Sequence, residues 1–212
     1  MARTGARAAA LKQLLQRAGL TPVDAQPARP SGAHYAAELH ALYRKLGGLL
    51  ASPVWRPGDW DMVFAGPLVV ELDEELHFNR YRAVTLDSSW ANSLPWTDAY
   101  RSYCAEHEDR CLDAGRWGKR WTNDSCARMF AGGPVGELDG AGAPRWKQRA
   151  FYDALKDTGA GNEIGLAIAR VAIYDTVDGV LLEDVLESRA AIEPPAVLAL
   201  VDQRTVAGGP SE

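Results

Sequence analysis

Two short apolar segments separated by a three-residue link place the strongest constraint on how this chain can fold. Residues 60–64 and 68–73 carry mostly bulky apolar side chains, and Ala65-Gly66-Pro67 lies between them. Short loops that contain glycine are typical of hairpins joining two antiparallel strands. The sequence therefore predicts a β-hairpin over residues 60–73.

The register of this hairpin brings acidic side chains together. The loop places Phe64 opposite Leu68, and the same register places Asp61 opposite Glu71. Alternate residues of a strand share a face, so Asp73 points to the same side as Glu71. Clustered carboxylates repel one another unless a cation binds, and their oxygens suit Mg²⁺ or Mn²⁺. We expect the three acids to be metal ligands, with edge-of-sheet acids paired to nearby arginines as the simpler alternative.

Periodicity and capping signals order the rest of the chain into helices and one further strand. Helices are predicted over 5–18, 34–47, 77–86, 97–110, 123–130, 144–157 and 181–188, a strand over 165–175, and a frayed tail over 203–212. This order predicts an α/β (α+β) fold, a mixed central sheet flanked by helices. We expect a single domain over 1–212, with an N-terminal helix and linker (1–33), a core (34–87 and 143–190) and a mostly helical insertion (88–142).

All three cysteines of the chain lie in the expected insertion, close to a histidine. Their order is Cys104-x2-His107-x3-Cys111-x14-Cys126. Three thiolates and one imidazole complete a tetrahedral zinc site with no open position, which is typical of a structural role. We therefore expect structural Zn²⁺ to stabilise the insertion. Three buried thiols and a surface histidine are the alternative.

The acidic hairpin resembles the signature of the PD-(D/E)xK nuclease superfamily, in which an Asp precedes a strand that ends in Glu-x-Asp or Glu-x-Lys. The stretch VVELDEELHF (69–78) is most similar to the small restriction-endonuclease-like group related to very-short-patch repair endonucleases. The resemblance covers about residues 34–86 and extends more weakly to 144–157 and 165–175. It implies a restriction-endonuclease-like core that hydrolyses DNA phosphodiester bonds with Mg²⁺ or Mn²⁺. It also implies Glu38, on the preceding helix, as an accessory acid.

The chain departs from this superfamily at Asp73, where a lysine is preferred. Another side chain would then have to act beside the attacking water, and the candidates are His77, Arg80, Lys147 and Gln148. Further basic residues suited to contacting nucleic-acid phosphates are Arg82, Arg145 and Arg149. Solvated helix faces are the alternative interpretation of these basic residues.

Composition limits the partners and the location that we expect. The formal net charge of −5 argues against a protein that holds nucleic acid by bulk charge, although it is compatible with a nuclease that has an acidic site. The chain has no apolar run long enough to predict a membrane span. Polar residues interrupt the apolar positions of the N-terminus, which is not typical of a signal peptide. We therefore expect a cytoplasmic protein.

We expect a metal-dependent endonuclease of the restriction, defence or repair type that acts on DNA. A homodimer or a defence-system partner protein is compatible with that role. Two alternatives stay open: a catalytically inactive nuclease fold that binds nucleic acid, and a zinc-stabilised protein-interaction module.

Overall fold

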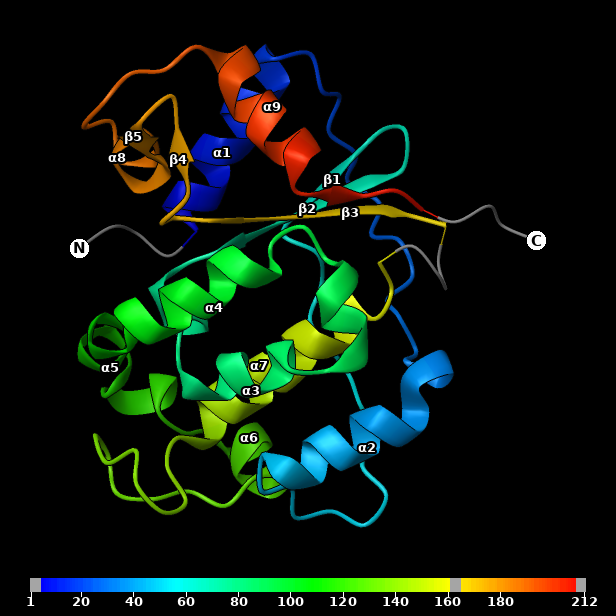
Figure 1. The fold of residues 1–212 in the computed structure, drawn as a ribbon, viewed down its shortest axis with the longest axis vertical. Coiled ribbons are helices and arrows are strands. Elements are labelled where there is room, and N and C mark those ends of the chain that lie inside the picture. The colour runs from blue at the N-terminus through cyan, green and yellow to red at the C-terminus, as the bar shows by residue number, and fades with distance from the viewer. Residues whose placement is uncertain (1–4, 161–164, 209–212) are drawn as a thin grey trace. The chain divides into compact units, whose positions relative to one another are not determined.

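The chain folds into two compact units, each assembled from segments distant in the sequence. A computed structural model describes residues 5–160 and 165–208 (Figure 1). The unit that contains the main sheet, here called the sheet unit, comprises Met1–Arg29, Asp59–Glu74 and Ala160–Glu212. The second unit, here called the helical unit, comprises Pro30–Gly58 and Glu75–Gly159.

Within the described residues, the main sheet has four strands in the order β1-β2-β3-β6. These are β1 (Met62–Phe64), β2 (Leu68–Asp73), β3 (Ala167–Ala172) and β6 (Thr205–Val206). The β1–β2 pair is antiparallel with Phe64 opposite Leu68, which confirms the predicted hairpin and its register. Strand β3 runs parallel to β2, and β6 runs antiparallel to β3. The sheet is therefore mixed, as expected for an α+β protein.

The described part of the sheet unit also contains helices and a small hairpin. They are α1 (Ala6–Arg17), α8 (Leu182–Leu186), α9 (Pro194–Gln203), β4 (Thr176–Val177) and β5 (Val180–Leu181). Helices α1, α8 and α9 lie on the same side of the sheet (Figure 1), where α1 contacts both α8 and α9. Helix α1 buries Leu11, Leu14 and Leu15, the apolar face that its sequence predicts. The burial of that face explains why the N-terminal segment belongs to this unit.

Helix α7 is the central element of the helical unit. The elements of this unit are η1 (Ala33–Tyr35), α2 (Ala36–Lys45), η2 (Glu75–His77), α3 (Arg80–Leu86), η3 (Ser89–Ser93), α4 (Thr97–Glu106), α5 (Glu108–Gly115), η4 (Gly118–Arg120), α6 (Asp124–Met129) and α7 (Pro144–Asp157). Helix α7 contacts α2, α3 and α6. Its fully buried Phe151 ring packs edge-on against Tyr43 and Phe130, and Trp146 packs against Trp121. Aromatic pairs of this kind form the core of the unit.

Several boundaries differ from the prediction. The single helix expected over 97–110 is wrong, because the backbone breaks at His107 (φ −120°, ψ 15°) and separates α4 from α5. Helix α3 begins at Arg80 rather than at residue 77, because Asn79 caps it with its side chain. Helix α9 and strand β6 were not predicted. Strand β6 lies within the expected tail, of which residues 209–212 fall outside the described part.

The compact units group the segments differently from the predicted core and insertion. Segment 88–142 belongs to the same unit as α2, α3 and α7, whereas α1 belongs with the sheet. Among the described residues, no helix combines the length and the apolar character that crossing a membrane requires.

Candidate functional site

The hairpin holds Asp61 and Glu71 together in the sheet unit, as its register predicts. The Asp61 backbone N–H donates to Glu71 Oε1 over 3.1 Å, and the Leu72 N–H donates to Asp61 Oδ2 over 3.0 Å. Asp61 directly precedes β1 and is exposed, whereas Glu71 on β2 is buried. Backbone amides therefore fix both carboxylates at this end of the hairpin.

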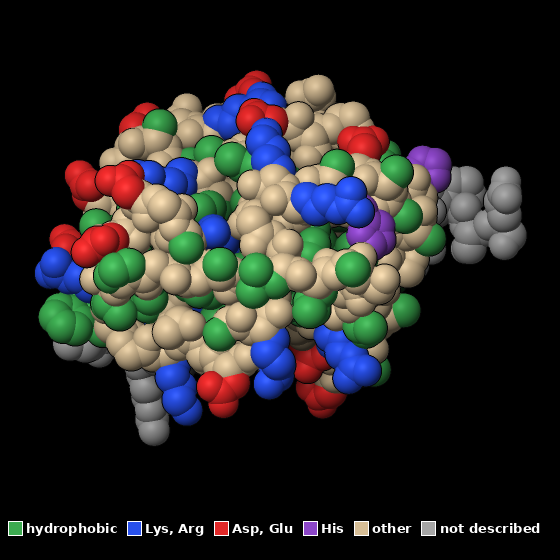
Figure 2. Space-filling view, turned by 90° about the horizontal axis from the view of Figure 1, so that it is seen from below, with side chains coloured by type: hydrophobic (Ala, Val, Ile, Leu, Met, Phe, Trp, Pro, Cys, Tyr) green, Lys and Arg blue, Asp and Glu red, His purple; other side chains and the backbone are tan. Residues whose placement is uncertain are grey.

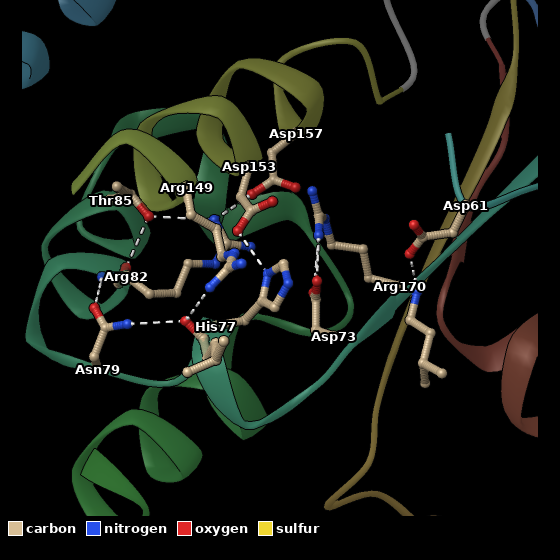
Figure 3. A network of polar contacts seen from close by, with 12 residues as sticks. Asp61, Asp73, His77, Asn79, Arg82, Thr85, Arg149, Asp153, Asp157 and Arg170 are labelled. Atoms are coloured by element: carbon tan, nitrogen blue, oxygen red, sulfur yellow. Dashed lines mark hydrogen bonds and ion pairs between the residues drawn. The ribbon is translucent and has the colours of Figure 1, made fainter. Parts of the chain in front are cut away.

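A buried arginine accompanies the third predicted ligand, Asp73. Arg170 on β3 lies opposite Glu71 in the parallel ladder, so both side chains point to the same face of the sheet. Its Nη1 atom lies 2.9 and 2.8 Å from the two carboxylate oxygens of Asp73 (Figure 3). Asp73 and Arg170 have side-chain exposures of 1% and 0%. The face predicted to carry the three acids therefore also carries a guanidinium, which compensates one of their charges.

The three acids supply the right donor atoms for Mg²⁺ but do not form an assembled site. Mg²⁺ binds oxygens at about 2.0–2.1 Å, so two ligand atoms lie at most about 4.2 Å apart. Asp61, Glu71 and Asp73, all within the described residues, do not form a group whose ligand oxygens lie within 4.8 Å of one another. A metal ion would have to draw the carboxylates closer together.

The predicted accessory acid, Glu38, lies in the helical unit. Ser89 Oγ is 2.9 and 2.7 Å from the two carboxylate oxygens of Glu38. Glu38 also lines a surface hollow together with Lys45 and Asp87. Its observed role is to connect α2 to the short helix η3.

His77 is held by an aspartate of α7. Its Nδ1 atom lies 2.9 Å from Asp153 Oδ2, and the two side chains are mostly buried (Figure 3). Arg149, also on α7, donates from Nη1 to the Leu76 carbonyl oxygen over 3.2 Å. An aspartate at one ring nitrogen fixes the orientation of an imidazole and favours its proton-accepting tautomer. His77 thus has the environment of a positioned base, and Arg149 anchors the turn before it.

Arg82 and Lys147, two basic residues predicted from the sequence as site residues, are buried inside the helical unit. Arg82 is fully buried, and its Nη1 atom lies 2.8 Å from Asp157 Oδ2. This ion pair connects α3 to α7, so Arg82 does not reach nucleic acid in this conformation. Lys147 is 6% exposed, and its ammonium lies 5.4 Å from the centre of the Tyr81 ring. Burial lowers the pKa of Lys147.

The remaining predicted residues, Arg80, Arg145 and Gln148, each have polar partners, and Gln148 is buried at 1% exposure. Arg80 forms a two-pronged ion pair with Glu108, and this hydrogen bonding raises the pKa of Arg80. Arg145 Nη1 donates to Gln148 Oε1 over 2.5 Å, and Gln148 Nε2 donates to Ser125 Oγ over 3.1 Å. In the face that Figure 2 shows, basic, acidic and apolar side chains are interspersed and form no continuous basic surface.

The three cysteines are buried. Cys126 Sγ accepts from the Asn123 backbone N–H over 3.1 Å at the start of α6. Asn79 Nδ2 donates to Cys111 Sγ over 3.6 Å, and burial raises the pKa of Cys111 to about 12. No group of three metal-ligating side chains among the described residues includes Cys104, Cys111 or Cys126. The zinc site, with His107 as its fourth ligand, stays a prediction.

Sequence reasoning missed three charged residues that pair with predicted ones. They are Arg170, Asp153 and Asp157. Arg170 could have been identified from the sequence, because it is the one charged residue in the otherwise apolar strand 167–172. Asp153 and Asp157 are four residues apart and share a face of α7, which the helical period alone could have indicated.

Comparison with known proteins gives a family and no described activity. No curated protein and no solved structure matches the chain. The model of a family of unknown function, DUF7255, matches residues 41–188. The matched segment includes the β1–β2 hairpin, α7 and Arg170. Because it spans more than half of the sequence, the chain belongs to the DUF7255 family.

Proposed function

We propose that the protein is a metal-dependent endonuclease that hydrolyses DNA phosphodiester bonds. The observation that carries the proposal is the position of Arg170. The PD-(D/E)xK signature calls for a cation two residues after the glutamate, where this chain has Asp73. Arg170 reaches the same face from the adjacent strand and lies against Asp73, so β3 supplies the positive charge that β2 lacks.

The order of the sheet elements also supports the proposal. The resemblance implies a hairpin that carries the acids, followed by the next helix and the next strand of the common core. Strands β1 and β2, helix α7 and strand β3 follow in that order, and β3 pairs parallel to β2. A shared order of elements supports a fold assignment, whereas the activity depends on the side chains.

Asp61 and Glu71 are the residues proposed to hold the metal, with Asp73 beside them. Bound Mg²⁺ or Mn²⁺ would supply an activated water and a charge that stabilises the reacting phosphate. To bind it, Asp61 and Glu71 would exchange hydrogen bonds to backbone amides for metal contacts. Arg170 keeps Asp73 in place and adds positive charge on the face that carries Glu71.

Plasmid nicking with a matched pair of variants tests this function. The wild-type protein should convert supercoiled plasmid to the nicked form with Mg²⁺ or Mn²⁺ and not with a chelator. Glu71→Gln should abolish nicking without changing the circular dichroism spectrum. Glu74→Gln is the control. It also removes one carboxylate charge, but from a half-exposed side chain three residues after Glu71. Equal nicking by wild type and Glu71→Gln would refute the assignment of the site.

A second candidate, nucleic-acid binding without cleavage, is favoured by the Asp73–Arg170 pair. A carboxylate already neutralised by a guanidinium has less to gain from a metal, and the three acids do not form one group. Under this alternative the protein retards labelled DNA in a native gel, with or without Mg²⁺, and leaves the DNA intact.

The structural zinc is a separate proposal, with its own measurement. Protein washed with a mild chelator should retain about one zinc per chain if the Cys₃His site forms. Metal analysis that finds none removes zinc from the proposal and leaves the nuclease assignment untouched.

A further inference from the structure

Lys147 is a buried cation for which the described residues provide no anionic partner. It is 6% exposed, and its ammonium forms no hydrogen bond or ion pair within the described residues; it lies near the Tyr81 ring. A Cβ added at Gly47 would lie 3.4 Å from its Nζ atom, so the ammonium also lies close to the backbone there. Burial alone accounts for the shift of its pKa, with no carboxylate contributing. An ammonium taken out of water without an acceptor is unfavourable, so this position calls for an explanation.

The Tyr81 hydroxyl is a second donor close to Lys147 for which the structure, where it is described, shows no acceptor. Its hydroxyl oxygen accepts from the Ala143 backbone N–H over 3.3 Å, and no described group accepts the hydroxyl proton. Tyr81 is 9% exposed, so this proton has little access to bulk water. The Lys147 ammonium near the Tyr81 ring and the hydroxyl of that ring therefore both lack an acceptor within the described part of the chain.

Both donors lie at the beginning of a long helix. Helix α7 has 14 residues, and Lys147 is its fourth, so its side chain points back toward the N-terminus of the helix. Ala143, which holds the Tyr81 hydroxyl, is the residue directly before the helix. A helix N-terminus carries partial positive charge from its unpaired amides and favours anions.

A glycine-rich loop leads into this helix. Residues 131–143 include five glycines, at positions 132, 133, 136, 140 and 142. Gly142 has φ 59°, and a Cβ there would lie 1.7 Å from the Tyr81 hydroxyl oxygen, so this position requires glycine. The Gly133 N–H donates to the Gly142 carbonyl oxygen over 2.8 Å and closes the loop on itself. Glycines of this kind let backbone amides approach a ligand closely.

The nearby acids do not neutralise the ammonium. Glu108 is held by Arg80 through contacts of 2.8–2.9 Å. The loop acids Glu137 and Asp139 are exposed to solvent. The start of α7 therefore combines positive charge with donors that have no acceptor in residues 5–160 and 165–208.

We propose that the start of α7 is a binding site for a phosphate group, with the Lys147 ammonium and the Tyr81 hydroxyl as its donors and the loop 131–143 beside it. The phosphate can be free inorganic phosphate or a terminal phosphate of a nucleotide. This site lies within the helical unit, is separate from the acids of the hairpin, and does not depend on the proposed nuclease activity.

Calorimetric titration of the full chain with inorganic phosphate, in a phosphate-free buffer of constant ionic strength, tests the site. Lys147→Met keeps the apolar stem and removes the charge, and it should weaken binding by at least about 10-fold, the value of one charged hydrogen bond. Tyr81→Phe removes only the hydroxyl and should weaken binding by a smaller factor. Lys156→Met is the matched control, because Lys156 lies on the same helix and is equally buried at 6% exposure.

Three readouts decide between the outcomes. Loss of affinity in Lys147→Met and Tyr81→Phe, with Lys156→Met unchanged, supports the site. Amide NMR signals of the loop glycines should shift on addition of phosphate to the wild type and not to Lys147→Met. A parallel titration with a nucleoside monophosphate distinguishes the two sources, because only tighter binding than inorganic phosphate indicates a nucleotide. Absence of phosphate binding to the wild type, or equal affinity in all four proteins, overturns the proposal.

Discussion

Replacing Arg170 tests the most consequential contact of the sheet unit. The Arg170→Met variant keeps a side chain of similar length and removes the guanidinium that contacts both oxygens of Asp73 at 2.9 and 2.8 Å. The carboxylate is left at 1% side-chain exposure without this cation. A buried charge that loses its partner costs about 3–5 kcal/mol of the free energy of unfolding.

The double variant separates the loss of the pair from the loss of packing. If the penalty arises from the stranded carboxylate, Arg170→Met combined with Asp73→Leu should recover most of it, because an apolar pair replaces an ionic one of similar volume. The coupling free energy of this double-mutant cycle should reach at least about 2 kcal/mol. Arg189→Met serves as a surface control, because Arg189 is 49% exposed although it also contacts carboxylates, and it should change stability by at most about 1 kcal/mol.

Hydrogen exchange is the suitable measurement, because it reports on the sheet locally. Amide exchange of peptides that cover β2 and β3 should accelerate in Arg170→Met and return toward the wild-type rate in the double variant. Urea unfolding followed by circular dichroism gives the overall free energy. A single variant that loses less than about 1 kcal/mol, or a double variant no more stable than Arg170→Met, would refute the argument from burial.

Three further predictions concern the helical unit. Asn79→Ala removes the cap that accepts from the Tyr81 and Arg82 amides over 3.1 and 3.3 Å, and it should lower the free energy of unfolding by about 1 kcal/mol, with Asn79→Asp as a milder control in the same urea titration. Burial raises the pKa of Cys111 to about 12, so at pH 8 iodoacetamide should modify it far more slowly in the native protein than in urea, as peptide mass spectrometry would detect; equal rates would contradict its burial. Burial lowers the pKa of Lys147 in the folded protein, so the charged ammonium destabilises the fold at pH values below that pKa. This loss of stability declines as the pH rises toward the pKa of the same side chain in the unfolded protein. In phosphate-free buffer, Lys147→Met should therefore raise stability at pH 7 and raise it less at pH 10; the same gain at both pH values would contradict this reasoning.

The hairpin was predictable because its determinants are local. Its loop is three residues long, and the loop length sets the register of β1 and β2. The pairing of Asp61 with Glu71 followed from that register over ten residues of sequence. The position of Asp73 beside Arg170 depends on a parallel strand 97 residues away, and no local pattern specifies which strand that is.

Helix α7 shows the same division between local and distant information. Its bounds agree with the prediction, since a proline at the first position and an apolar period define it locally. The partners of its buried acids were not predicted, because Asp153 meets His77 and Asp157 meets Arg82 through tertiary packing. The break at His107 was not predicted, because the helical pattern of the sequence continues through this residue although its backbone is not helical.

The same Arg170 variants also separate a metal site from a charge-balanced face. Glu71, Asp73 and Arg170 together carry one formal negative charge, and removing Arg170 leaves the two carboxylates unbalanced on that face. If this face binds Mg²⁺, Arg170→Met should be stabilised by millimolar Mg²⁺ more than the wild type, because a ligand that binds only the folded state adds its binding free energy to stability. Replacing Asp73 by Leu as well should remove that gain. NaCl of matched ionic strength, without divalent cations, should not reproduce the gain in Arg170→Met. Equal effects of Mg²⁺ on all three proteins would mean that the face is a buried ion pair and that a catalytic metal, if the protein uses one, binds elsewhere.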